Sequence, residues 1–123
     1  MAYTIRYHRF QQGNGGRKMM TFTIKKVWFD LIKSGEKKEE YRDLNYYYHV
    51  RVCSLVGTND YKKLVEKGER VPFKDLKLRN GYGKDAPSII VSGWISIGKG
   101  IPQWGAEPGK KYFRFEIETV KAG

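Results

Sequence analysis

Two segments in the last third of the chain alternate apolar and polar residues, which is the pattern of β-strands with one buried face. In the first segment the apolar positions are Ile89, Val91, Ile95 and Ile97, and in the second they are Phe113, Phe115 and Ile117. Successive side chains of a strand point to opposite faces, so each segment predicts a strand whose odd-numbered residues are buried. The second segment is the predicted closing strand of the domain.

Shorter elements precede these strands. We predict a strand over 21–24, a helix over 27–34 that Gly35 ends, and a strand over 38–44 in which Tyr41 points into the core. Residues 45–55 permit a helix, although β-branched residues and three consecutive tyrosines weaken that prediction. A short helix is predicted over 59–67, capped by Asn59 and ended by Gly68. Residues 76–79 alternate like another strand.

Several short strands with two or three short helices predict an α+β domain, most simply a partly closed β-barrel of five to six strands. A length of 123 residues suits one domain. We place that domain at residues 21–123 and interpret residues 1–20 as a basic, flexible N-terminal segment, because it contains four basic residues, no acidic residue and a glycine-rich stretch. Alternatively, residues 4–8 alternate well enough to form an extra strand.

The charge balance points to an anionic partner. Lys and Arg number 24 against 13 Asp and Glu, giving a net charge of +11. Such an excess attracts nucleic acid, nucleotides or anionic lipid, although it also serves solubility alone. An aromatic content of 15% favours nucleic acid, because bases stack on aromatic rings. RNA or a nucleotide is therefore the expected partner, and a membrane is not.

Other classes of protein have little support in the sequence. No apolar run has the roughly 18 residues of a membrane helix, and no secretory signal is evident. Cys53 is the one cysteine, which excludes an internal disulfide and fits a reducing cytoplasm. We expect Cys53 to be inert because no base is predicted near it. His8 and His49 lack a matching cluster, so we expect no metal and no cofactor.

The most specific motif runs from Gly35 to Arg42. Glu40 and Arg42 are two residues apart in a predicted strand and share a face, and Lys37 lies in the turn before it. Arg42 can grip a phosphate or carboxylate with two parallel hydrogen bonds, and Lys37 adds a point charge. Glu40 can orient either cation or accept a hydrogen bond from a base. The alternative is a solvent-exposed charged hairpin with ordinary ion pairs.

This motif resembles the GxKxxExR signature of the ASCH domain family within the PUA-like superfamily. Further similarity to small bacterial and phage members of the family lies in residues 28–35, 78–87 and 97–105, and the resemblance spans residues 21–120. It implies a PUA-like β-barrel with a cleft lined by Lys37, Glu40 and Arg42. ASCH domains are generally thought to bind RNA, so the resemblance also implies RNA or nucleotide binding.

The resemblance leaves catalysis open. One bacterial branch is an amidohydrolase that removes an acyl group from N4-acetylcytidine, using the signature lysine and a threonine nucleophile. Glu40 stands where that threonine would be, and a carboxylate is a poor substitute for a hydroxyl nucleophile. Other members are described as ribonucleases, which implies acid–base roles for Lys37 and Glu40 if this chain is an enzyme. A protein-interaction module with a basic face is a third hypothesis.

Further ligand-binding candidates lie in two glycine-rich loops and on one strand. Arg79, Asn80, Tyr82 and Lys84 could surround an anion together with backbone N–H groups, although a plain turn explains the same residues. Trp94 has the opposite parity from its apolar neighbours, so we expect it to be exposed or to face the cleft. Trp94 and Tyr82 are candidate platforms for base stacking. Trp104 either stacks on a base or closes one end of the barrel. Lys99 could meet a phosphate or simply be solvated.

Overall fold

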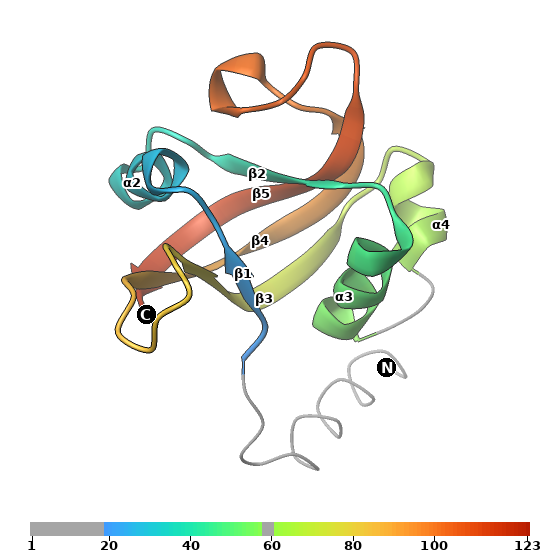
Figure 1. Ribbon diagram of the computed structural model, residues 1–123. Coiled ribbons are helices and arrows are strands. Elements are labelled where there is room, and N and C mark those ends of the chain that lie inside the picture. Colours follow the sequence, from blue (N-terminus) through green and yellow to red (C-terminus); the bar gives the residue numbers. More distant parts are fainter. Residues whose placement is uncertain (1–18, 58–60) are drawn as a thin grey trace.

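One five-stranded sheet, curved into a half-barrel, organises the chain, and three short helices pack around it (Figure 1). The structure is a computed structural model that describes residues 19–57 and 61–123. The elements are β1 (Thr21–Thr23), α2 (Lys26–Ser34), β2 (Glu39–Asp43), α3 (Tyr46–Val56), α4 (Tyr61–Glu66), β3 (Val71–Arg79), β4 (Ser88–Lys99), a 3₁₀ turn at Pro102–Trp104 and β5 (Lys111–Ala122). This architecture confirms the predicted α+β class and partly closed barrel.

The strand order is β1-β3-β4-β5-β2, so β1 and β2 are the two edges of the sheet. The β1–β3 pair is parallel, and the other pairs are antiparallel. Irregularities in register between Phe73 and Leu76 and between Ser92 and Gly93 accompany the curvature, since bulges bend and twist strands. At Gly93 a Cβ atom would lie 1.9 Å from the carbonyl oxygen of Glu116, which explains why glycine occupies this position.

The core lies between the concave face of the sheet and the helices. Most of the odd-numbered apolar residues that the alternation places on the inner face are buried there, namely Ile89, Val91, Ile95, Phe113 and Phe115. Ile97 and Ile117 are only partly buried and pack against this core. The helices contribute Phe29 and Ile32 from α2, Val52, Leu55 and Val56 from α3, and Tyr61 and Val65 from α4. The Phe115 ring meets the rings of Phe22 and Phe73 edge-on. One continuous apolar cluster therefore joins β1, β3, β4 and β5 to the helices.

The helix boundaries follow from local chemistry. Helix α2 ends at Gly35, which adopts a left-handed φ of 89°, as predicted. The ambiguous stretch after residue 45 does form a helix, because the Asn45 side chain accepts a hydrogen bond from the backbone N–H of Tyr48 and caps its first turn. Gly68 lies just beyond α4 with a φ of 82°. The predicted cap Asn59 lies outside the described residues.

Tyr41 is not in the core: it is half-buried on the outer face of the sheet, because its neighbours Glu40 and Arg42 occupy the inner face. Of the basic segment predicted over residues 1–20, only Met19 and Met20 lie in the described part, and Met20 packs against the core rather than belonging to a free tail. The alternative strand at 4–8 lies outside the described residues. Within the described part, no helix has both the length and the apolar composition needed to cross a membrane.

Candidate functional site

Glu40 and Arg42 point into the half-barrel. In the antiparallel β2–β5 pair, Glu40 lies opposite Phe115 and Arg42 opposite Phe113. Directly opposed residues of neighbouring strands share a face, and both phenylalanines are core residues. The carboxylate of Glu40 is accordingly buried, with 9% of its side chain exposed. The same-face prediction for Glu40 and Arg42 is confirmed, and that face is the interior.

Lys37 enters the interior from the turn that follows α2. The left-handed Gly35 reverses the chain, and the Lys37 backbone N–H donates to the carbonyl of Leu31, 2.9 Å away. This local geometry directs the Lys37 side chain inward, and it is fully buried. The neighbouring charges Glu36 and Lys38 are exposed. The alternative of a solvent-exposed charged hairpin is thus wrong for Lys37 and Glu40.

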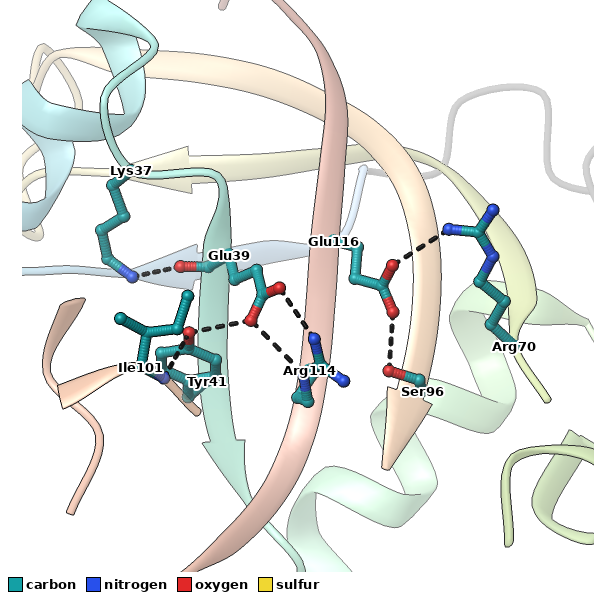
Figure 2. A network of polar contacts seen from close by, with 8 residues as sticks. All are labelled: Lys37, Glu39, Tyr41, Arg70, Ser96, Ile101, Arg114 and Glu116. Atoms are coloured by element: carbon teal, nitrogen blue, oxygen red, sulfur yellow. Dashed lines mark hydrogen bonds and ion pairs between the residues drawn. The ribbon is translucent and has the colours of Figure 1, made fainter. Parts of the chain in front are cut away.

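The buried ammonium of Lys37 has polar and aromatic neighbours. It donates to a carboxylate oxygen of Glu40 at 3.0 Å and to the backbone carbonyl of Glu39, a contact visible in Figure 2. It also lies 5.5 Å from the ring centroid of Trp28 and 5.0 Å from that of Tyr41. Cations are attracted to aromatic faces, so these rings partly replace the lost hydration.

Arg42 connects three elements. Its Nη2 donates to the second carboxylate oxygen of Glu40 at 2.9 Å and to the backbone carbonyl of Thr23 in β1 at 3.1 Å. Its Nη1 lies 3.1 Å from the hydroxyl oxygen of Tyr48 in α3, to which it donates. The guanidinium also lies over the Phe22 ring, 4.8 Å from the centroid. Arg42 therefore bridges the two edge strands and fastens α3 to them.

Lys37, Glu40 and Arg42 form what we call the signature cluster. It contains two cations and one carboxylate, so it carries one positive charge that the cluster itself does not balance. Burial lowers the pKa of Lys37, an effect that the nearby Glu40 carboxylate opposes. The Nε atom of Arg42 is buried and has no hydrogen-bond partner among the described residues. An arrangement of this kind can stabilise an anion or, through Lys37, move a proton.

A second polar network lies on the outer face of β2 and β5 (Figure 2). Arg114 pairs with the Glu39 carboxylate through two hydrogen bonds of 2.8 and 3.3 Å. The Tyr41 hydroxyl donates to the same carboxylate at 2.8 Å and accepts from the backbone N–H of Ile101. Burial raises the pKa of Tyr41, so its hydroxyl remains protonated. Sequence reasoning missed this network, because Glu39 and Arg114 are far apart in the chain.

The outer face continues with Trp94, one of the stacking candidates. The Arg70 guanidinium covers its ring at 4.5 Å, and the indole N–H donates to Glu118 at 2.9 Å. Arg70 also pairs with Glu116, which accepts from the hydroxyl of Ser96 (Figure 2). Trp94 lies on the side of the sheet opposite its apolar neighbours, as its parity indicates. Its ring is half-buried and is already stacked with an arginine.

The remaining candidates lie elsewhere, and none of the hydrogen bonds or ion pairs of the described residues joins their side chains to the signature cluster. Tyr82 and Lys84 are exposed, in a loop that backbone hydrogen bonds from Asn80 to Pro87 and from Ala86 to Gly83 hold closed. Arg79 and Asn80 are half-buried at the base of this loop, Lys99 is exposed at the end of β4, and Trp104 is half-buried in the 3₁₀ turn. The predicted site is therefore drawn together only at Lys37, Glu40 and Arg42.

Cys53 is half-buried and unpaired, and burial raises the pKa of its thiol. The expectation that no base lies near it is wrong, because the Nε2 atom of His49 is 3.8 Å from the sulfur. A thiol whose pKa is raised is nevertheless a poor nucleophile at neutral pH.

Over residues 19–57 and 61–123, no group of three or more His, Cys, Asp or Glu side chains is arranged to hold a metal ion.

Comparison with known proteins adds no assignment: no family model, curated protein or solved structure matches this chain. The similarity to ASCH domains therefore stays a prediction based on the residues of the signature.

Proposed function

We propose that this chain is a nucleic-acid-binding domain whose preferred ligand is RNA or a nucleotide. The observation that carries this proposal is the unbalanced positive charge of the signature cluster. Lys37 and Arg42 share the single carboxylate of Glu40, in surroundings where charge interactions are stronger than in water. An anionic group that approaches the cluster would supply the missing negative charge. The net charge of +11 adds a long-range attraction for polyanions.

The three residues have different roles in this proposal. Lys37 is fully buried and already holds two acceptors, so it positions Glu40 rather than meeting the ligand. Glu40 in turn fixes the guanidinium of Arg42. Arg42 retains 15% exposure of its side chain and is the member that can contact a phosphate. The similarity to ASCH domains and the reducing compartment suggested by a lone cysteine agree with a cytoplasmic RNA-binding role.

The ligand class can be tested by titration. Short single-stranded RNA, DNA of the same sequence and mononucleotides are titrated by fluorescence anisotropy at several salt concentrations. We expect RNA binding to weaken steeply with salt, because each neutralised phosphate releases counter-ions. Absence of binding to all three ligands at low salt, together with stable capture of an acidic protein, would replace this proposal with the protein-interaction hypothesis.

A hydrolase is the second candidate, and the lowered pKa of Lys37 favours it. A lysine that gives up its proton more easily is better suited to act as a general base. Because Lys37 is fully buried, hydrogen-bonded Glu40, whose side chain keeps 9% exposure, would pass the proton between the substrate and Lys37. The substrates to assay are acylated cytidine and labelled RNA, with Glu40→Gln and Lys37→Arg as variants. If turnover by the wild-type protein survives both substitutions, neither residue is catalytic.

A further inference from the structure

A hollow lies away from the signature cluster and is lined by residues from the end of β2, from α3 and α4 and from the sheet. Figure 1 shows where these elements meet. Its volume is about 540 Å³, within the roughly 300–1,000 Å³ typical of small-molecule sites. Phe113 and Tyr61 line it from the core, Tyr46 and His49 line it from α3, and Lys62 and Glu66 line it from α4. None of the three signature residues lines this hollow.

The lining contains an unusual succession of rings. Tyr46 and His49 have centroids 6.0 Å apart and lie within 33° of parallel. His49 and Tyr61 are 5.8 Å apart at 35°, and Tyr61 is 6.3 Å from Phe113. Tyr61 and Phe113 are buried behind the outer rings, so a planar, aromatic guest would stack on Tyr46 and His49. Offset stacking is the favoured contact between such rings.

The inner rings are held in place, whereas the outer ring is open. The Nδ1 atom of His49 lies 2.9 Å from the hydroxyl oxygen of Tyr61, within hydrogen-bond distance, and both Tyr61 and Phe113 are core residues. Tyr46 by contrast is 79% exposed. Large exposed aromatic rings beside a hollow are typical of binding surfaces, because water leaves them favourably when a ligand arrives.

The rim adds two opposite charges. Lys62 and Glu66 are four residues apart on α4, and both are exposed. None of the ion pairs in residues 19–57 and 61–123 includes either of them. A guest with an anionic group at one end and a hydrogen-bond donor on its ring could therefore use both charges without displacing an existing partner.

We propose that this hollow binds the base of a nucleotide. The base would stack against Tyr46 and His49, and its phosphate would pair with Lys62. Glu66 would accept a hydrogen bond from an amino group on the base edge, as carboxylates do with cytosine. A purely apolar guest would leave both rim charges unused, and the excess of cationic residues in the chain disfavours a cationic guest.

This inference deepens the proposed function, because it assumes the same class of ligand, but it places the base in a different part of the molecule. The nucleotide can be a free mononucleotide or an unpaired nucleotide of an RNA strand. Both sources present the same ring and an anionic phosphate group to the hollow.

Variants of exposed residues allow a test with little risk to folding. Tyr46→Ala removes the outer ring, and Tyr82→Ala removes another highly exposed tyrosine as its control. Lys62→Ala removes the rim cation, and Lys63→Ala removes the neighbouring exposed lysine as its control. AMP, CMP, adenosine and inorganic phosphate are titrated into each protein while backbone amide NMR signals are recorded.

We expect AMP and CMP to shift the amide signals of Tyr46, His49 and Lys62. Tyr46→Ala should weaken binding at least about fivefold, since stacking on a side chain contributes roughly 1–3 kcal/mol per base. Lys62→Ala should weaken the binding of AMP but leave the binding of adenosine unchanged. The two control variants should bind both ligands as tightly as the wild type does. The inference is overturned if nucleotides leave these three amides unshifted, or if Tyr46→Ala binds AMP as tightly as Tyr82→Ala does.

Competition separates the two sources and the two sites. A short RNA that displaces AMP from the hollow identifies a strand residue as the natural occupant, whereas simultaneous binding identifies the free nucleotide. If RNA binds and depends on Arg42 but shifts no signal in the hollow, this inference fails while the proposed function stands. If AMP binds in the hollow but no RNA binding depends on Arg42, the inference stands and the signature cluster is not the binding site.

Discussion

The guanidinium of Arg42 donates a hydrogen bond to the backbone carbonyl of Thr23, 3.1 Å away, and so joins the two edge strands of the half-barrel. The same guanidinium is held by the Glu40 carboxylate. Arg42 therefore has two roles: it is the proposed phosphate contact, and it stabilises the fold by joining the two edge strands. Any substitution at Arg42 must be assessed for stability as well as for binding.

Replacing Arg42 with Ala should destabilise the protein by about 3 kcal/mol, because it leaves the buried Glu40 with one cation fewer and the Thr23 carbonyl without that donor. Urea unfolding followed by circular dichroism measures this loss. The matched control is Arg70→Ala, which removes a half-exposed ion pair with Glu116 and a contact with the Trp94 ring and should cost roughly 1 kcal/mol. Equal losses for the two variants would show that the bridge between the edge strands is unimportant.

Lys37 should give the protein a characteristic pH dependence. Its folded-state pKa lies below the ordinary value of 10.5, so over the interval between the two values the unfolded chain binds more protons than the folded one. The contribution of Lys37 to stability therefore rises as the pH rises through its folded pKa toward 10.5. We expect the difference in unfolding free energy between wild type and Lys37→Met to grow over that alkaline interval.

A control for the Lys37 experiment is Lys38→Met, which removes the neighbouring exposed lysine. Its difference from wild type should stay flat over the same interval. A Lys37→Met protein that follows the wild-type curve in parallel at every pH would contradict the placement of this ammonium in the interior.

Tyr41 should lower the stability of the protein as the pH rises, whereas Lys37 should raise it. Burial raises the folded-state pKa of Tyr41 above the ordinary value of 10.0, so stability is fully present below pH 10 and is lost as the pH rises beyond it. Tyr41→Phe should lessen that alkaline loss. It should also cost about 1–2 kcal/mol at neutral pH, because the backbone N–H of Ile101 loses its acceptor. Parallel pH profiles for the two proteins would refute this assignment.

Gly93→Ala tests the packing of the bulge between β4 and β5. The added Cβ would fall 1.9 Å from the carbonyl oxygen of Glu116, so the two backbones must move apart. We expect destabilisation of roughly 1–3 kcal/mol or more, the range for overpacking in a filled interior. Gly83→Ala is the control, because a Cβ there meets nothing within 4 Å. If Gly93→Ala is as stable as Gly83→Ala, the β4 and β5 backbones at the bulge are packed less tightly than the structure shows.

Much of the fold could be predicted because local patterns decide it. Alternation placed Ile89, Phe113 and Phe115 in the core, and Gly35 marked the end of α2. The direction of Tyr41 was predicted wrongly, because alternation shows which residues share a face but not which face is inside. The helix at 46–56 was ambiguous, since the tertiary contacts of Val52 and Val56 outweigh their weak helical propensity.

The sequence predicted which residues of the candidate site share a face, but not which residues they contact. The spacing of Glu40 and Arg42 predicted a shared face, which the structure has. Their partners could not be found in this way, because Thr23 is 19 residues from Arg42 and the Glu39–Arg114 pair spans 75 residues. Nor could spacing distinguish Tyr48, which binds Arg42, from the two adjacent tyrosines that are exposed.

The proposed function requires that Arg42, which Glu40 holds and Lys37 supports through Glu40, receives an anionic group of RNA. The most direct test compares RNA binding by wild type and Arg42→Gln between about 50 and 200 mM salt, with circular dichroism confirming that both are folded. We predict that Arg42→Gln binds at least about tenfold more weakly and that its salt slope is smaller by about one. A folded Arg42→Gln protein with the wild-type affinity and the wild-type salt slope would contradict the proposed contact between Arg42 and RNA.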